Sequence, residues 1–177
     1  MAEEFTNEEK KVVCPRCGFD ISKEYTPLSE ELIKSYFKSA LAQVPFSKTY
    51  SLFGGIIDVT FEEATGKLLQ AQEGALRLKN ANGTMGVADA MDFALLPSLV
   101  SISYKHPETG LKQEVYSATA AEREEYLKKG ELPDVLTSMP IVKLQAVRNT
   151  FATFAKLCAD LVVASQDESF WEGVGRN

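Results

Sequence analysis

Residues 45–72 read PFSKTYSLFGGIIDVTFEEATGKLLQAQ, and this stretch combines strand, helix-start and helix patterns in one run. Aromatic and β-branched residues alternate on both sides of Gly54-Gly55, which predicts a strand interrupted there by a bulge or a tight turn. Thr60 is followed three residues later by Glu63, which is the spacing of a capping box. We therefore expect the strand to give way to a helix near Thr60.

Helical patterns flank this stretch on both sides. Thr26 before Pro27 predicts an N-cap, and apolar residues then recur at three- and four-residue spacing to about Gln43. Further helices are expected from Thr60 to about Lys79, over residues 87–96, from a second capping box at Thr119 to Gly130, and from about Ser138 to about Ser165. The chain is therefore expected to be mostly helical.

A β-hairpin is expected in the middle of the chain. Residues 99–104 and 111–116 are of strand type, and Gly110 in the loop between them can adopt the left-handed conformation. The lone histidine, His106, falls in that loop, so we expect it at an exposed tip without a catalytic role. The few strands and many helical patterns predict an α+β fold, with about five helices around a small antiparallel sheet.

Composition limits the domain organisation and the partners. The chain of 177 residues carries a net charge of -6, which argues against a nucleic-acid partner because phosphate binding depends on Lys and Arg. It holds no apolar run long enough for a membrane helix and no signal-peptide pattern, so we expect a cytoplasmic protein. We predict a flexible arm with a cysteine motif at 1–24, one α+β domain at 25–165 and a tail at 166–177.

The cysteine motif is Cys14-Pro-Arg-Cys17-Gly, the form of a zinc knuckle. A structural zinc site needs four ligands, and the chain holds no second pair of this kind, so the ligand set is incomplete. Cys158, His106, a carboxylate such as Asp20, or the same motif of another subunit are the candidates to complete it. A turn without metal and a redox dithiol are the alternatives.

The last helical pattern carries an apolar seam. Its members recur at alternating three- and four-residue steps, close to a heptad repeat: Leu144, Val147, Phe151, Phe154, Cys158 and Leu161. The seam is either the core face of an amphipathic helix or a surface for self-association. Phe170 and Trp171 in the tail either cover the core or anchor a partner. We predict an interface formed by the seam, apart from Cys158, together with these two aromatic residues.

Four common catalytic motifs are absent from the sequence. The chain lacks the phosphate-binding G-x-x-x-x-G-K-[ST] and G-x-G-x-x-G patterns, the G-x-S-x-G nucleophile turn and the H-E-x-x-H zinc pattern. The paired acids Glu62-Glu63 and Glu124-Glu125 are explained as first-turn helix charges. We therefore expect a protein that is not an enzyme.

Leu52-Phe53-Gly54-Gly55, the apolar strand after it and Val59-Thr60-Phe61 resemble segments of tail-assembly and baseplate-hub-associated proteins of contractile-tailed bacteriophages. The resemblance covers residues 45–80. It implies a structural or assembly component that binds other tail or baseplate proteins or itself, in the host cytoplasm during assembly and with the virion as a further location. The alternative is a zinc-stabilised binding or adaptor module of a cellular complex.

Overall fold

The chain folds as helices around one antiparallel sheet. The computed structural model describes residues 28–106 and 108–165. The elements in chain order are α1 (Glu30–Leu41), β1 (Ser47–Leu52), the 3-10 turn η2 (Phe53–Gly55), β2 (Ile57–Glu62), α2 (Gly66–Ala81), α3 (Val87–Leu95), β3 (Leu99–Lys105), β4 (Lys112–Ser117), α4 (Ala120–Lys129), α5 (Asp134–Ser138) and α6 (Ile141–Ser165). The expected α+β fold, largely helical with a small antiparallel sheet, is confirmed for the described residues.

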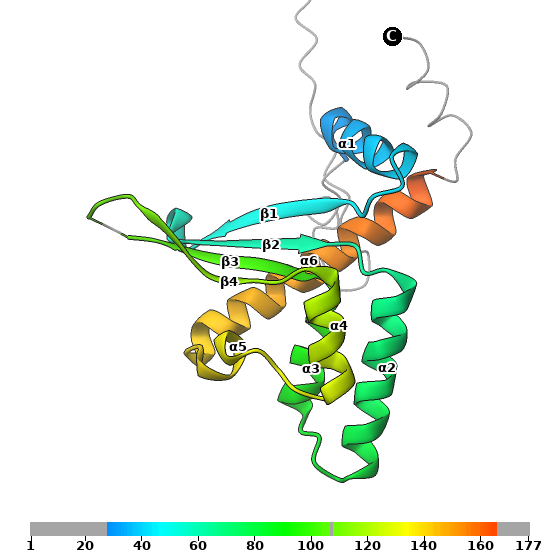
Figure 1. Cartoon of the computed structure of the whole chain (residues 1–177). Coiled ribbons are helices and arrows are strands. Elements are labelled where there is room, and N and C mark those ends of the chain that lie inside the picture. The colour runs from blue at the N-terminus through cyan, green and yellow to red at the C-terminus, as the bar shows by residue number, and fades with distance from the viewer. Residues whose placement is uncertain (1–27, 107, 166–177) are drawn as a thin grey trace, which may run out of the picture.

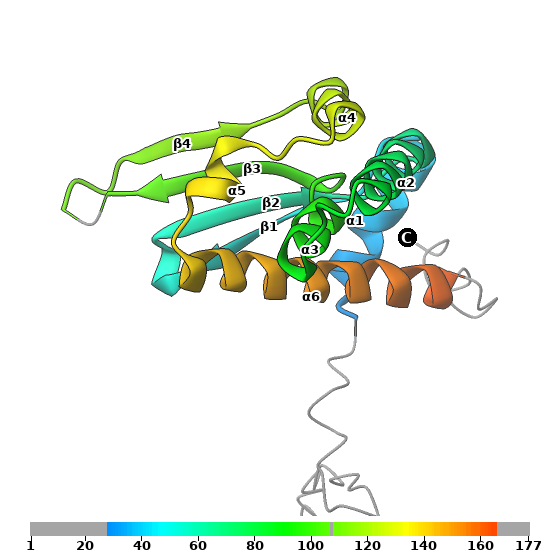
Figure 2. The same ribbon diagram turned by 90° about the horizontal axis from the view of Figure 1, so that it is seen from below.

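The sheet has two chemically different faces. Its order is β1-β2-β3-β4, and each strand runs antiparallel to its neighbours. Side chains alternate between the faces, so one cross-strand row is apolar and the adjacent row is polar. The apolar row is Tyr50, Val59, Ile102 and Tyr116, and the polar row is Thr49, Thr60, Ser101 and Ser117. Helix α6 lies across the apolar face, while no described helix covers the polar face (Figures 1 and 2).

The turn between β1 and β2 confirms the predicted interruption of the central strand. Phe53, Gly54 and Gly55 all have positive φ angles, of 53°, 67° and 89°. Gly54 and Gly55 adopt this region without a Cβ clash, which explains the glycine pair. The strand therefore reverses here, and its two halves pair with each other from Leu52↔Ile57 to Ser47↔Glu62.

The predicted helix start at Thr60 is wrong. Thr60 lies inside β2, and α2 begins only at Gly66, after Thr65 as N-cap. The carboxylate of Glu63 instead accepts a hydrogen bond from the backbone N–H of Phe46, at 3.2 Å. Pairing of β2 with both neighbours continues past Thr60 because its apolar side chains, including the fully buried Phe61, fill the core. Long-range strand pairing therefore overrides the local capping signal. Glu62 and Glu63 are accordingly not first-turn helix residues.

Two other helix starts also differ from prediction. Helix α1 begins at Glu30, where the hydroxyl of Ser29 accepts from the N–H of Leu32 at 3.3 Å, and not at Pro27. Ser138 ends α5 and donates to the carbonyl of Asp134 at 2.6 Å, so it does not cap α6. The capping box of α4 is confirmed, as is its left-handed end at Gly130, which has a φ of 65°.

The buried side chains form two clusters. The larger one joins the apolar face of the sheet to α6, and Phe154 stacks there on Phe61 with ring centroids 5.7 Å apart. The smaller one lies among α2, α3 and α4 at one end of the sheet (Figure 1) and contains Leu68, Ala75, Phe93, Leu96 and Leu127. No helix in residues 28–106 or 108–165 combines the length and apolar character needed to cross a bilayer.

Candidate functional site

Strand β4 is an edge of the sheet, and no strand within residues 28–106 or 108–165 pairs with its outer side. The N–H of Ala118 bonds to the carbonyl of Val100 at 2.9 Å, and the N–H of His106 bonds to the carbonyl of Leu111 at 2.8 Å. Because backbone groups alternate in direction along an antiparallel strand, these bonds fix which residues face outward. Allowing for the bulge at Val115, the outward groups belong to Lys112, Glu114 and Ser117.

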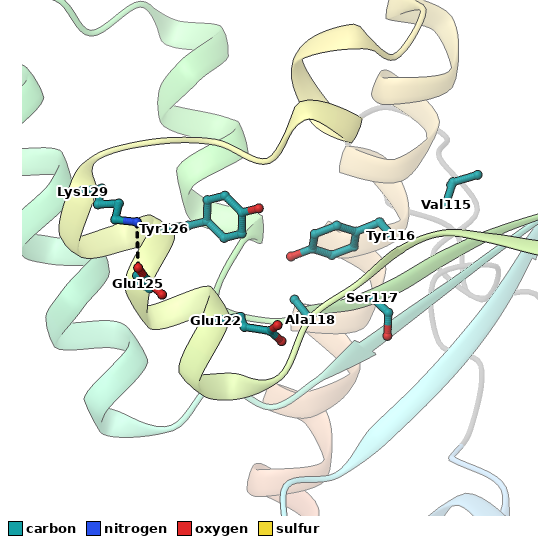
Figure 3. Close-up of a pocket in the computed structure, with 8 residues that line it drawn as sticks. All are labelled: Val115, Tyr116, Ser117, Ala118, Glu122, Glu125, Tyr126 and Lys129. Carbon is teal, nitrogen blue, oxygen red and sulfur yellow. Dashed lines mark ion pairs between the residues drawn. The ribbon is translucent and has the colours of Figure 1, made fainter.

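A cavity of about 450 Å³ lies where β4 meets α4. Its lining comes from the end of the strand and from one side of the helix, and consists of Val115, Tyr116, Ser117, Ala118, Glu122, Glu125, Tyr126 and Lys129. Figure 3 shows the ring of Tyr116 from β4 and the ring of Tyr126 from α4, with their hydroxyls pointing toward each other. We call this cavity the β4–α4 pocket.

Tyr116 places a buried hydroxyl without a hydrogen-bond partner among the described residues at the pocket. Its side chain is only 9 % exposed. Burial raises the pKa of Tyr116, so the phenol is neutral at physiological pH and its hydroxyl can both donate and accept. A buried hydroxyl without a partner destabilises the fold by about 1–3 kcal/mol, and a ligand with polar atoms can remove that cost.

Acidic side chains line the mouth of the pocket. Glu122 closes the capping box, and its Oε2 accepts from both the N–H and the hydroxyl of Thr119, each at 2.8 Å. These bonds lower the pKa of Glu122, the backbone bond being the larger cause, so the carboxylate is ionised at neutral pH. Glu125 pairs with Lys129 at 2.7 Å. The lining therefore holds two carboxylates and one ammonium group.

Arg123 fixes the wall behind the pocket. Its side chain is 1 % exposed, and its guanidinium donates to the carbonyl of Ala118 at 3.2 Å and pairs with the carboxylate of Glu62. These bonds tie the first turn of α4 to the end of β4 and to β2. The position of Tyr126 relative to Tyr116 is therefore set by a charged anchor that the sequence analysis did not identify.

A second cavity, of about 470 Å³, lies between α6 and the end of β2. Its lining includes Glu63, Ser98, Phe154 and Cys158. Burial, and secondarily the charge of Glu63, raises the pKa of Cys158 to about 12, so the thiol is protonated at neutral pH. No group of three or more His, Cys, Asp or Glu side chains is placed to hold a metal within the described part of the chain.

The sequence-predicted site residues fall into two groups. Cys14, Cys17, Asp20, Phe170 and Trp171 lie outside the described residues. The zinc prediction and the role of the tail therefore stay predictions.

The seam of α6 lies among the described residues. Leu144, Val147, Phe154 and Leu161 are buried, and Phe151 is partly buried. The chain's own sheet covers them, because the apolar face of β1–β3 needs a helix of this length and period. This burial favours the core alternative, and a contact of the seam with another chain stays a prediction.

The signals that could have located the β4–α4 pocket are local ones. Tyr116 ends an alternating strand, and Tyr126 follows a capping box at one-turn spacing from Glu122. Neither pattern predicts that the two rings meet.

A comparison of the chain with protein-family models, curated proteins and solved structures finds no match.

Proposed function

We propose that this protein is a structural or assembly subunit that works by binding other proteins, and that the free edge of β4 is a docking surface. The observation that carries the proposal is the exposed, unpaired backbone of Lys112, Glu114 and Ser117 beside a pocket with an unpartnered buried hydroxyl. An exposed edge strand is a template for pairing with a strand of another chain.

The resemblance of residues 45–80 supports a tail or baseplate of a contractile-tailed bacteriophage as the assembly. The partners would then be other tail or baseplate proteins or a second copy of this chain, met in the host cytoplasm during assembly or in the virion. The alternative of a zinc-stabilised adaptor rests on Cys14 and Cys17.

The carboxyl-terminal part of the chain remains a second proposed contact, in a changed form. The buried seam of α6 is occupied, but Val162 and Val163 on the same helix are 43 % and 68 % exposed. They lie a few residues before Phe170 and Trp171 in sequence. We therefore place this contact on the outer face of the last turn and on the tail.

The test is capture of the partners encoded beside this gene by the full chain and by an edge variant. Ser117→Lys places a charge on the edge strand β4, at the polar face of the sheet, and an edge lysine opposes addition of a further strand. Gln70→Lys on the exposed surface of α2 is the matched control. We expect Ser117→Lys to reduce capture and Gln70→Lys to leave it unchanged. A chain that stays monomeric and captures none of these proteins would contradict the proposal.

A further inference from the structure

We infer that the β4–α4 pocket binds an arginine or lysine side chain carried by an extended partner segment that pairs with the free edge of β4. This inference rests on the proposed function, because it specifies which side chain the partner segment paired with β4 would carry. It adds a ligand class and an anchoring position to a surface that otherwise offers only backbone pairing.

The chemistry of the lining favours a cation. Four side chains of the lining can accept a hydrogen bond from a positively charged donor. They are the carboxylates of Glu122 and Glu125 and the hydroxyls of Tyr116 and Tyr126. Both hydrogen bonds from Thr119 go to Oε2 of Glu122, which leaves Oε1 to a ligand as far as the described residues are concerned. The lining carries two carboxylates against the one ammonium group of Lys129, which pairs with Glu125, so its net charge is negative and disfavours an anion. An apolar ligand would leave the hydroxyl of Tyr116 unpaired.

The two tyrosine hydroxyls add to this preference, because each can accept a hydrogen bond from a guanidinium or ammonium group. Figure 3 shows the two rings on opposite sides of the space between β4 and α4, with the acidic residues at the helix side. Arginine suits this arrangement best, because its planar fork offers five donors to acceptors that lie in different directions.

The position of the pocket favours a side chain from an extended segment. A strand that adds to β4 lies about 4.8 Å from it, and alternate side chains of the new strand project to the face on which Tyr116 lies. Ser117 lines the pocket and also directs its backbone groups outward, so pairing and anchoring occur at the same point. The protein carries a net charge of -6, which favours a basic segment.

The test uses the full 177-residue chain and capped pentapeptides followed by amide NMR. The probe has the sequence Thr-Val-Arg-Val-Thr, and its partners replace Arg by citrulline, which has the same shape without charge, or by Glu. We expect saturable shifts at Glu114, Ser117 and Tyr126 with the Arg peptide, and affinity weaker by about tenfold or more with citrulline. Agmatine, the guanidinium without a backbone to pair, should bind more weakly still.

Variants separate the anchor from the fold. Tyr116→Phe keeps the ring and removes the hydroxyl, so we expect weaker binding of the Arg peptide and a higher melting temperature of the free protein. Glu125→Gln should also weaken binding. Glu73→Gln, in the exposed i,i+4 pair with Arg77 on α2, is the matched control and should change nothing.

Several results would overturn the inference. They are equal affinity for the Arg and citrulline peptides, equal affinity for agmatine and the Arg peptide, shifts confined to another surface, or full binding by Tyr116→Phe. Absence of peptide binding together with normal capture of partner proteins would refute the cationic anchor and leave the proposed function standing. Peptide binding without any captured partner would support the anchor and contradict assembly with the neighbouring gene products.

Discussion

Arg148 holds Asp92 through two parallel hydrogen bonds, from Nε to Oδ1 and from Nη2 to Oδ2, each 2.7 Å long. Both side chains are buried, and Nη2 also donates to the carbonyl of Ala88 at 3.3 Å. The pair joins α6 to α3 across 56 residues of sequence. Its bidentate geometry raises the pKa of Arg148, with Asp92 as the largest cause, so the arginine stays charged in the interior.

Breaking this pair from one side should strongly destabilise the protein. Asp92→Ala leaves the guanidinium buried and unpaired, so we expect the free energy of unfolding in urea to fall by about 3–5 kcal/mol. Replacing both partners, as Asp92→Leu with Arg148→Met, should cost less, because no charge is left behind. Glu73→Ala on the exposed surface serves as control. A loss below about 1 kcal/mol for Asp92→Ala would show that the pair is not desolvated.

The seam of α6 gives a second prediction, which separates core from interface. Phe154 is 2 % exposed, and Phe154→Ala should lower the free energy of unfolding by about 3–5 kcal/mol. Val163→Ala on the exposed side of the same helix should change it by less than about 0.5 kcal/mol. Chemical denaturation of both variants provides the measurement. If Phe154→Ala kept its stability and changed only the oligomeric mass, the seam would be an intermolecular surface after all.

Alkaline pH should destabilise the fold through partly buried acids, of which Cys158 and Tyr50 are two. Burial raises the pKa of Cys158 from 9.0 to about 12 and that of Tyr50 from 10.0 to about 12. Between these values the unfolded chain has lost the protons that the folded chain still holds. Stability is therefore full below pH 9 and falls as the pH rises toward 12.

Cys158→Ala provides the check on the alkaline prediction. Removal of the thiol should make the decline in melting temperature between pH 9 and pH 10 shallower, because the remaining acids with a raised pKa are the tyrosines Tyr36, Tyr50 and Tyr116, which ionise in the unfolded chain only near 10.0. Equal slopes for the two proteins over that interval would show that Cys158 titrates normally in the folded state.

The zinc prediction is checked by metal analysis. Protein purified without chelator should contain zinc at a fixed ratio to chain, and Cys14→Ser with Cys17→Ser should abolish it. Cys158→Ser tests whether that thiol completes the site, and a ratio of one zinc to two chains would indicate ligands shared between subunits. Metal-free protein under these conditions counts against the site.

Features set by neighbouring residues could be predicted from the sequence. The hairpin of β3 and β4, the capping box at Thr119 and the helix end at Gly130 each depend on a few adjacent residues, and all three are confirmed. The helix start at Thr60 failed because a capping pattern also occurs inside strands, where two paired neighbours decide the outcome.

The candidate site could not be predicted, for a related reason. Tyr116 and Tyr126 belong to different elements, and their approach depends on Arg123, whose partners Glu62 and Leu99 are distant in sequence. The seam of α6 was identified correctly as a pattern, but an apolar stripe of this period serves a core or an interface equally well. Only the position of the sheet decides between them.

The smaller buried cluster, formed by Leu68, Ala75, Phe93, Leu96 and Leu127, has a consequence for partial unfolding. It holds α2, α3 and α4 together with few apolar side chains, while the sheet and α6 share a larger set. Local stability follows such differences, so these three helices should open as one cooperative unit and exchange their amide hydrogens at a lower free energy than the strands. The β4–α4 pocket has one wall on each side of this difference, because α4 supplies Tyr126 and β4 supplies Tyr116. The pocket should therefore be lost whenever α4 unfolds locally, even while the sheet stays folded.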